Sequence, residues 1–175
     1  MLKTIALIAM TLMAAILIYA ATKPDTFQVQ RSTHIAAAPE KIFGLIEDLQ
    51  QWASWSPWEK MDPAMKKSYS GAPQGAGAAL NWDGNDAVGT GRMEIVSTVP
   101  SSRVVIKLDF LKPFEAHNQA EFTLEGGGTA TTVTWAMHGP QPFMMKAMDL
   151  VMGMDRMVGK DFETGLANLK QLAEQ

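Results

Sequence analysis

Residues 67–138 constrain the fold most, because turns that contain glycine or proline divide this segment into short runs typical of β-strands. The spacing of these turns predicts six strands. In the last of them, Val133, Trp135 and Met137 alternate with polar or small residues. We therefore expect an antiparallel sheet that buries one face and exposes the other to water.

Further elements are predicted on both sides of this strand series. An alternating run at residues 27–35 predicts a first strand, and Pro39 then begins a short amphipathic helix. Residues 142–152 predict a short methionine-rich helix, and residues 154–174 carry apolar side chains at the spacing of a long amphipathic helix. This order predicts an α+β domain in which a curved antiparallel sheet of about seven strands wraps around the long C-terminal helix and leaves a hollow.

The first two dozen residues form a segment of a different kind. No charged residue occurs at positions 4–22, and a helix of about 20 apolar residues matches the thickness of the bilayer core. The alternative is a cleaved signal peptide, whose apolar stretch is usually about 7–15 residues long. A cleavage site is poor here, because Ile18 or Tyr19 stands where a small residue is needed. A transmembrane anchor is the preferred interpretation.

The charges around this segment predict its orientation. The amino terminus and Lys3 favour a cytoplasmic N-terminus, with Lys23 on the exit side as the opposing charge. We expect residues 1–24 to be a single-pass anchor, or else a signal segment, in the inner membrane of a bacterium. Residues 25–175 would then form one domain on the periplasmic side.

Composition and motifs argue against several classes of function. The net charge is −3 without a lysine or arginine cluster, so nucleic acid is not an expected partner, and the absence of cysteine excludes thiol chemistry. His34, His117 and His138 have no partner at the spacing of metal ligands, so we expect no metal and no cofactor. Asp155 and Asp161 flank the apolar stripe of the last helix. They are expected to pair with basic residues, although a buried carboxylate there could act as a general base.

Two groups of large side chains allow more than one interpretation. Trp52, Trp55 and Trp58 follow at three-residue spacing and are expected to pack the short helix onto the sheet, or to form an aromatic gate at a cavity mouth. The methionines of residues 137–157 could fill an irregular core, form an adaptable ligand-binding wall, or contact a membrane. Core filling is the interpretation we prefer for the methionines.

Six segments of the chain match a known superfamily: residues 35–43, 52–58, 91–93, 122–124, 133–135 and 159–170. On these segments the chain resembles the helix-grip superfamily that includes START domains and the birch-pollen allergen, often called SRPBCC. More narrowly, it looks like the membrane-anchored bacterial members described as polyketide cyclase/dehydrase and lipid transport. The resemblance extends from Phe27 to the C-terminus and implies a helix-grip fold with a cavity suited to an apolar ligand.

The candidate ligand site starts from one strand of the predicted sheet. Phe114, Ala116, Asn118, Ala120 and Phe122 share one face by alternation, and Phe122 should face inward. Large residues at both ends and small ones between them describe a hollow. Asn118 would offer it one polar group, or would instead satisfy a bulge or bond to the helix. The expected ligand-binding residues are Trp82, Ala116, Asn118, Ala120, Trp135 and Met137.

The leading functional hypothesis is the membrane-tethered binding or transfer of a hydrophobic small molecule or lipid, without covalent chemistry and without catalytic residues. One alternative is a polyketide cyclase/dehydrase-like enzyme, in which inward-facing titratable groups move protons. Another is a protein-interaction module with a vestigial cavity. A cluster of inward titratable residues would favour the enzyme, and an exposed apolar strip would favour the module. The alternation pattern predicts neither of them.

Overall fold

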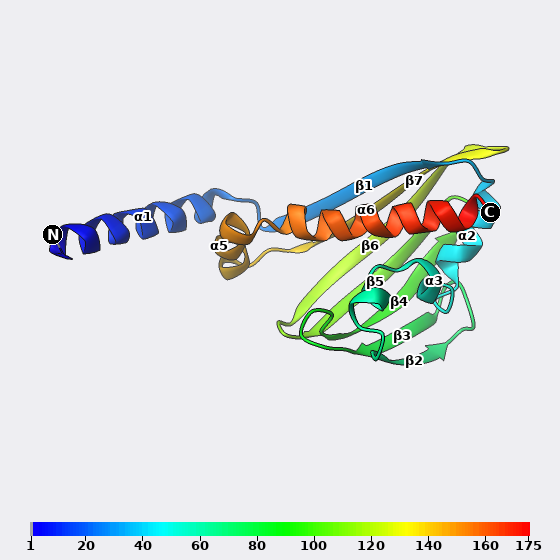
Figure 1. Cartoon of the computed structure of the whole chain (residues 1–175), viewed down its shortest axis with the longest axis horizontal. Coiled ribbons are helices and arrows are strands. Elements are labelled where there is room, and N and C mark those ends of the chain that lie inside the picture. The colour runs from blue at the N-terminus through cyan, green and yellow to red at the C-terminus, as the bar shows by residue number, and fades with distance from the viewer. Residues whose placement is uncertain (1) are drawn as a thin grey trace.

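The computed structural model describes residues 2–175, so Met1, the first residue of the expected anchor, lies outside the described residues. Six helices and seven strands follow one another in that range (Figure 1). In chain order they are α1 Leu2–Thr22, β1 Thr26–Ile35, α2 Pro39–Glu47, α3 Trp52–Trp55, α4 Trp58–Met61, β2 Lys66–Gly71, β3 Ala78–Asp83, β4 Thr90–Val99, β5 Arg103–Lys112, β6 Ala116–Gly127, β7 Ala130–Pro140, α5 Phe143–Met152 and α6 Met154–Ala173.

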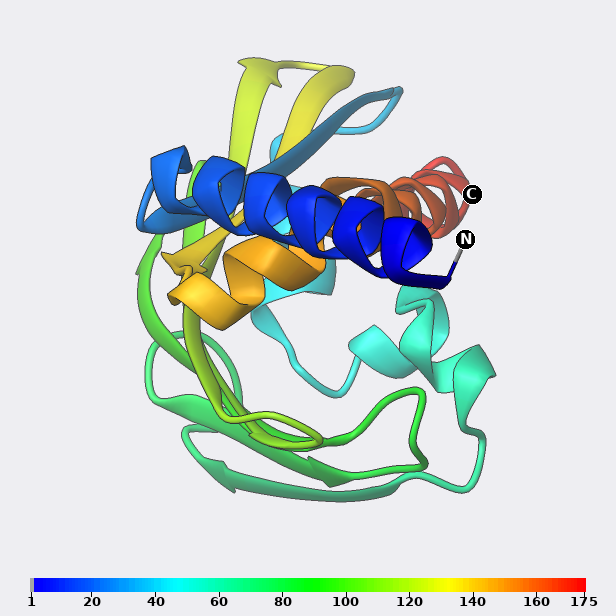
Figure 2. The same ribbon diagram turned by 90° about the vertical axis from the view of Figure 1, so that its left-hand side faces the viewer.

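All seven strands belong to one antiparallel sheet in the order β1-β7-β6-β5-β4-β3-β2. The first strand pairs with the last along its whole length, from Thr26 opposite Pro140 to Ile35 opposite Thr131. The sheet curves around α6, which lies along its concave side (Figures 1 and 2). The predicted α+β helix-grip fold, with one strand before the short helix and six after it, is confirmed.

The core lies between the concave face of the sheet and α6. Phe162 of α6 stacks on Trp135 of β7 with a distance of 4.1 Å between ring centroids and an angle of 6° between the rings. The helix approaches this closely because residue 165 is glycine, where an added Cβ would lie 2.8 Å from a carbon of the Trp135 ring. The largest fully buried side chains include Trp55, Trp135, Phe122, Phe162, Leu166 and Leu169.

Ion pairs hold the first half of α6 against the edge strand β1. The guanidinium of Arg31 lies 3.0 Å from Asp155 and 2.7 Å from Glu163, measured between nitrogen and oxygen atoms. The Arg31 side chain thus connects the outer face of the helix to the sheet. The expectation that Asp155 pairs with a basic residue is confirmed, and its partner comes from a strand.

Helix α1 projects away from the domain, and α5 lies beside its C-terminal end (Figures 1 and 2). Lys3–Thr22 is long and apolar enough to cross a membrane, with a mean hydropathy of 2.3, and an N-terminal signal sequence has the same properties. Most large side chains of α1 are exposed, whereas Ala20 is fully buried. Within residues 2–175, α1 is the only helix long and apolar enough to cross a membrane. Its C-terminal turns, which contain Ala20, contact the domain.

Candidate functional site

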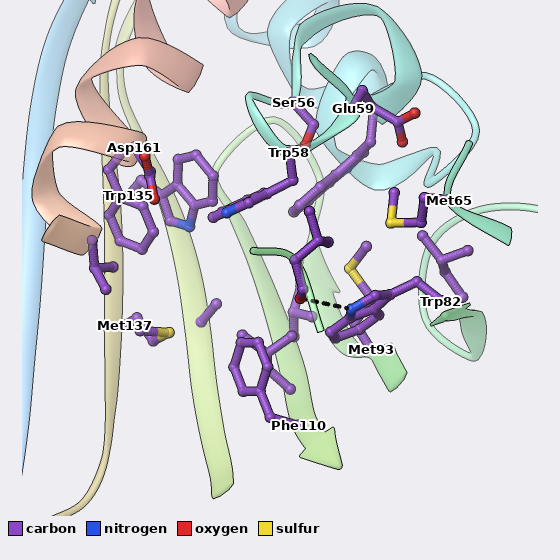
Figure 3. Close-up of a pocket in the computed structure, with 18 of the residues that line it drawn as sticks. Ser56, Trp58, Glu59, Met65, Trp82, Met93, Phe110, Trp135, Met137 and Asp161 are labelled. Carbon is purple, nitrogen blue, oxygen red and sulfur yellow. Dashed lines mark hydrogen bonds between the residues drawn. The ribbon is translucent and has the colours of Figure 1, made fainter. Parts of the chain in front are cut away.

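A cavity of about 230 Å³ lies between the concave face of the sheet, the first half of α6 and the α3–α4 segment (Figure 3). Its volume is slightly below the range of roughly 300–1,000 Å³ that is usual for drug-sized ligands. Only Ser56, Glu59 and Asp161 bring a hydroxyl or carboxyl group to its wall, and the other lining residues are apolar or aromatic. The cavity is therefore suited to a mostly apolar molecule.

The hollow exists because small residues occupy key positions of the strands. Ala120 of β6 lies between Ile106 of β5 and Met137 of β7 in the sheet register. Its small side chain leaves empty space between the sheet and α6. On β4, residue 91 is glycine opposite Trp82, and a Cβ there would overlap the Trp82 ring. The Trp82 indole can therefore lie close against β4 and form one side of the cavity.

The expected ligand-binding residues divide into two groups. Trp82, Ala120, Trp135 and Met137 line the cavity, each from a strand position that alternation assigned to the inner face. All four are at least nine-tenths buried. Their role in ligand binding stays a prediction, because no ligand is present.

Ala116 and Asn118 do not line the cavity, although they precede Ala120 on β6. The Asn118 side chain lies over Gly139 of β7, where a Cβ would overlap its Oδ1 atom. Asn118 Oδ1 has no hydrogen-bond partner among the described residues. Ala116 is paired with Phe110 of β5, and at this level of the sheet the Phe110 ring forms the cavity wall instead.

The expectation that Phe114 faces inward is wrong. The side chain is 60% exposed, because β6 begins only at Ala116 and Phe114 belongs to the preceding turn. The alternation that places Ala120 and Phe122 on the inner face therefore does not extend to this residue.

The three tryptophans of the α3–α4 segment pack this segment onto the rest of the domain as expected, and a gating role stays a prediction. Trp52 and Trp55 are buried, and their indole nitrogens donate hydrogen bonds to the carbonyl oxygens of Ile46 at 2.9 Å and Leu45 at 3.1 Å. These bonds fasten α3 to the end of α2. Trp58 is half-buried, lines the cavity and packs edge-to-face on Trp135 at 5.6 Å.

Few polar groups face the cavity. The indole nitrogen of Trp135 is buried and has no hydrogen-bond partner among the described residues, and it points towards the middle of the cavity (Figure 3). Burial raises the pKa of the Asp161 carboxyl, while the nearby Lys160 acts in the opposite direction. Glu59 is already paired with Lys67 at 2.7 Å. Besides the Ser56 hydroxyl and the paired Glu59, the site thus offers the unpartnered indole donor of Trp135 and the Asp161 carboxyl group, and alternation alone did not identify these roles.

This arrangement supports binding better than it supports metal chemistry. Within residues 2–175, no group of three or more histidine and acidic side chains is close enough together to hold a metal ion. The exposed His117 pairs with Asp109 at 2.7 Å outside the cavity, and this hydrogen bond raises the pKa of His117. The polar groups inside are the Trp135 N–H, the Ser56 hydroxyl and the carboxyl groups of Glu59 and Asp161, which allow hydrogen bonding and proton exchange.

A curved seven-stranded sheet closed by a long helix over an apolar cavity defines a helix-grip ligand-binding domain. The chain belongs to the family described as polyketide cyclase / dehydrase and lipid transport, whose profile matches residues 26–174. No curated protein matches the sequence. The family and the cavity together make this a fold for hydrophobic ligands, and the resemblance seen in the sequence is confirmed.

Solved structures of similar fold include two proteins that are named as aromatase/cyclases. The di-domain ARO/CYC BexL from the BE-7585A biosynthetic pathway is 15% identical with a TM-score of 0.65, and 90% of this chain matches 53% of that protein. The Zhui aromatase/cyclase from Streptomyces sp. R1128 is 14% identical with a TM-score of 0.62, with 85% and 94% of the two chains covered. The Aha1 dimer from Colwellia psychrerythraea is 17% identical with a TM-score of 0.56, with 85% and 96% covered. At these identities the likeness concerns the fold alone.

Proposed function

We propose that this protein binds or transfers a hydrophobic small molecule or lipid in the cavity beneath α6, while residues 1–24 tether residues 25–175 to a membrane. The observation that carries the proposal is an apolar cavity with a single unpartnered buried donor, the indole N–H of Trp135. Ligand sites are usually built this way, with an apolar wall that supplies affinity and a few polar groups that fix orientation. We place the domain on the periplasmic side of an inner membrane, following the charges around α1.

The preferred ligand is a mostly apolar molecule with one hydrogen-bond acceptor at or near one end. A buried donor without a partner costs about 1–3 kcal/mol, and a ligand carbonyl or carboxyl oxygen at Trp135 would remove that cost. Asp161 stands on α6 and lines the cavity, where burial raises the pKa of its carboxyl group. The polar end of the ligand would therefore lie between β7 and α6.

Native mass spectrometry of the full chain, extracted in a mild detergent, tests the proposal. We expect the protein to carry a small apolar molecule that is released on collisional activation. Ala120→Phe fills the hollow and should remove this molecule from an otherwise folded protein. Ala136→Phe adds the same ring to the outward face of β7, next to Met137, and should leave the bound molecule in place.

Two results would contradict this proposal. If Ala120→Phe unfolds the domain while Ala136→Phe does not, the space above Ala120 is already filled and the cavity is not a ligand site. If both variants retain the bound molecule, it lies elsewhere on the protein. Circular dichroism of both variants separates loss of fold from loss of ligand.

The second candidate function is that of a cyclase/dehydrase-like enzyme. Asp161 favours it, because a carboxyl group with a raised pKa at a cavity wall is suited to proton transfer. Asp161→Asn separates the two functions: an enzyme would keep its ligand and lose turnover of it, whereas a carrier would keep both its ligand and the rate of transfer. Mass analysis of the ligand before and after incubation with each protein measures turnover directly.

A further inference from the structure

Apolar side chains are exposed at the end of the domain where α1 enters. Phe143 and Met144 of α5 are 43% and 69% exposed, and Met157 in the first turns of α6 is 55% exposed. The turn between β5 and β6 lies at the same end of the domain (Figures 1 and 2). It carries Phe114, which is 60% exposed, and it follows Leu111 near the end of β5, which is 55% exposed. Three separate segments thus present large apolar side chains to the surroundings of α1.

The position of α5 relative to α1 is fixed by polar contacts. Lys146 of α5 is 6% exposed, and its Nζ donates hydrogen bonds to the carbonyl oxygen of Lys23 at 2.8 Å and to Asp25 Oδ1 at 2.6 Å. The backbone N–H of Gln141, just before α5, donates to the carbonyl oxygen of Asp25 at 2.7 Å. These contacts hold α5 at the residues that immediately follow α1. A membrane that α1 crosses would therefore also contact α5, if its surface lies at the C-terminal end of α1.

Helix α5 combines polar contacts to the protein with exposed apolar side chains. Lys146 and Asp149 face the protein, where Asp149 accepts hydrogen bonds from the backbone N–H of Met154 at 2.6 Å and from the Gln141 side chain at 3.3 Å. Phe143 and Met144, in the first turn of the same helix, are exposed. The apolar side chains of a helix that lies in the plane of a membrane enter about 5–10 Å deep into the boundary between headgroups and acyl chains.

We propose that this end of the domain is a membrane-seating face, in which Phe143, Met144 and Phe114 enter the lipid interface around α1. The inference rests on the proposed membrane tether and extends it from one helix to two segments of the folded domain, α5 and the turn between β5 and β6. The partner is a lipid bilayer and not a protein, because the face continues directly from a helix of bilayer length. The net charge of −3 and the absence of a basic cluster in the sequence make apolar burial its driving force, so binding should depend little on salt.

Two segments at the seating face also contribute to the cavity wall. Phe110 lines the cavity and is followed by the exposed Leu111, and Val158 lines it and follows the exposed Met157. Seating would therefore bring this side of the cavity close to the lipid. An apolar ligand could then move between bilayer and cavity with little exposure to water.

Single-cysteine labelling tests this face in the full chain, because the natural sequence has no cysteine. An NBD fluorophore is attached to Met144→Cys, Phe114→Cys, Ile8→Cys or Val99→Cys, and each protein is reconstituted in phosphatidylcholine vesicles with or without brominated acyl chains. Ile8 reports on α1, and its side chain is 55% exposed. Val99 is the matched control, because its side chain is 52% exposed. It ends β4 and pairs with Arg103 at the start of β5, whereas Phe114 follows the other end of β5.

We expect the labels at positions 144 and 114 to lose roughly half of their emission to brominated lipid, as does the label at position 8, while the label at position 99 changes little. The loss should persist at high salt. If the label at position 8 is quenched but the labels at positions 144 and 114 behave like the label at position 99, the proposed seating face is wrong. The proposed membrane tether through α1 is then still supported. If position 8 is not quenched, the tether itself fails and the face fails with it. Equal quenching at all four positions, or quenching that salt abolishes, would also overturn the inference.

Discussion

The two halves of the concave face of the sheet are built on the same strands and covered by the same helix, yet one is packed and the other is hollow. In the packed half, the Phe122 ring lies 5.9 Å from Trp52, 6.1 Å from Trp55 and 4.8 Å from Trp135. Two residues earlier on β6, Ala120 faces the cavity. In this domain, the size of the side chain at neighbouring inward positions of β6 therefore separates packed core from cavity.

The packed half should be the more sensitive to truncation. Phe122 is fully buried and surrounded by three tryptophans. Phe122→Ala should lower the free energy of unfolding by about 3–5 kcal/mol, because it removes a ring and leaves a void that rigid neighbours cannot fill. Urea unfolding followed by tryptophan fluorescence measures this loss. A value below about 1 kcal/mol would mean that this half is not packed as described.

Truncation in the hollow half should cost less. Met137 is 6% exposed and faces existing empty space on its inner side. Met137→Ala should lower the free energy of unfolding by about 1–2 kcal/mol, since it removes apolar contacts but enlarges a cavity that is already there. The same urea experiment, run beside Phe122→Ala, gives the difference. Equal losses for the two variants would remove the distinction between the halves.

The order of the elements could be predicted because alternation and helical spacing are local properties of the chain. Residues 27–35 and residues 154–174 show these periods plainly, and β1 and α6 form within one or two residues of the expected bounds. The same local rule placed Trp82, Ala120, Trp135 and Met137 on the inner face. Burial of one sheet face therefore gave these four of the 19 residues that line the cavity without knowledge of the register.

The remaining parts of the site depend on contacts between distant segments. Asn118 is excluded from the cavity because Gly139 of the neighbouring strand leaves room for its side chain, which is a consequence of register. Phe114 is exposed because the strand begins two residues later. The unpartnered N–H of Trp135 and the burial of Asp161 depend on how α6 crosses the sheet. The position of the Asn118 side chain and the unpartnered Trp135 N–H have no local signal in the sequence, whereas Pro113 before Phe114 and the place of Asp161 beside the apolar stripe of the last helix are local features.

A smaller effect concerns the polar end of the hollow half. Trp135→Phe retains an aromatic ring against Phe162 but removes the free donor, and it should weaken binding of dodecanoate about three- to tenfold, the value of one hydrogen bond. Trp82→Phe is the matched control in the same cavity, because the Trp82 nitrogen already donates to the Val88 carbonyl oxygen at 3.4 Å. Isothermal titration calorimetry compares the two variants. Equal weakening by both would show that the Trp135 donor does not contact the ligand.

The smallest effect is a pH dependence that belongs to the hollow half. Burial raises the pKa of Asp161 above its ordinary value of 3.8, so the folded state binds this proton more tightly than the unfolded state does. Stability from this group is full below 3.8 and falls as the pH rises through the folded pKa. Urea unfolding between about pH 4 and pH 7 should show a smaller loss of stability for Asp161→Asn than for the natural protein. If the free energy of unfolding depends on pH equally in the two proteins, the carboxyl group of Asp161 is exposed to solvent.

The central claim is that the hollow half is the place where an apolar molecule binds, and methionine methyl NMR tests it most directly. Met93 and Met137 line the cavity, whereas Met61 is 40% exposed and does not line it. In the full chain labelled with ¹³C at the methionine methyl groups, saturating dodecanoate should shift the signals of Met93 and Met137 and leave that of Met61 unchanged. Unchanged Met93 and Met137 signals in the presence of bound dodecanoate would contradict the account.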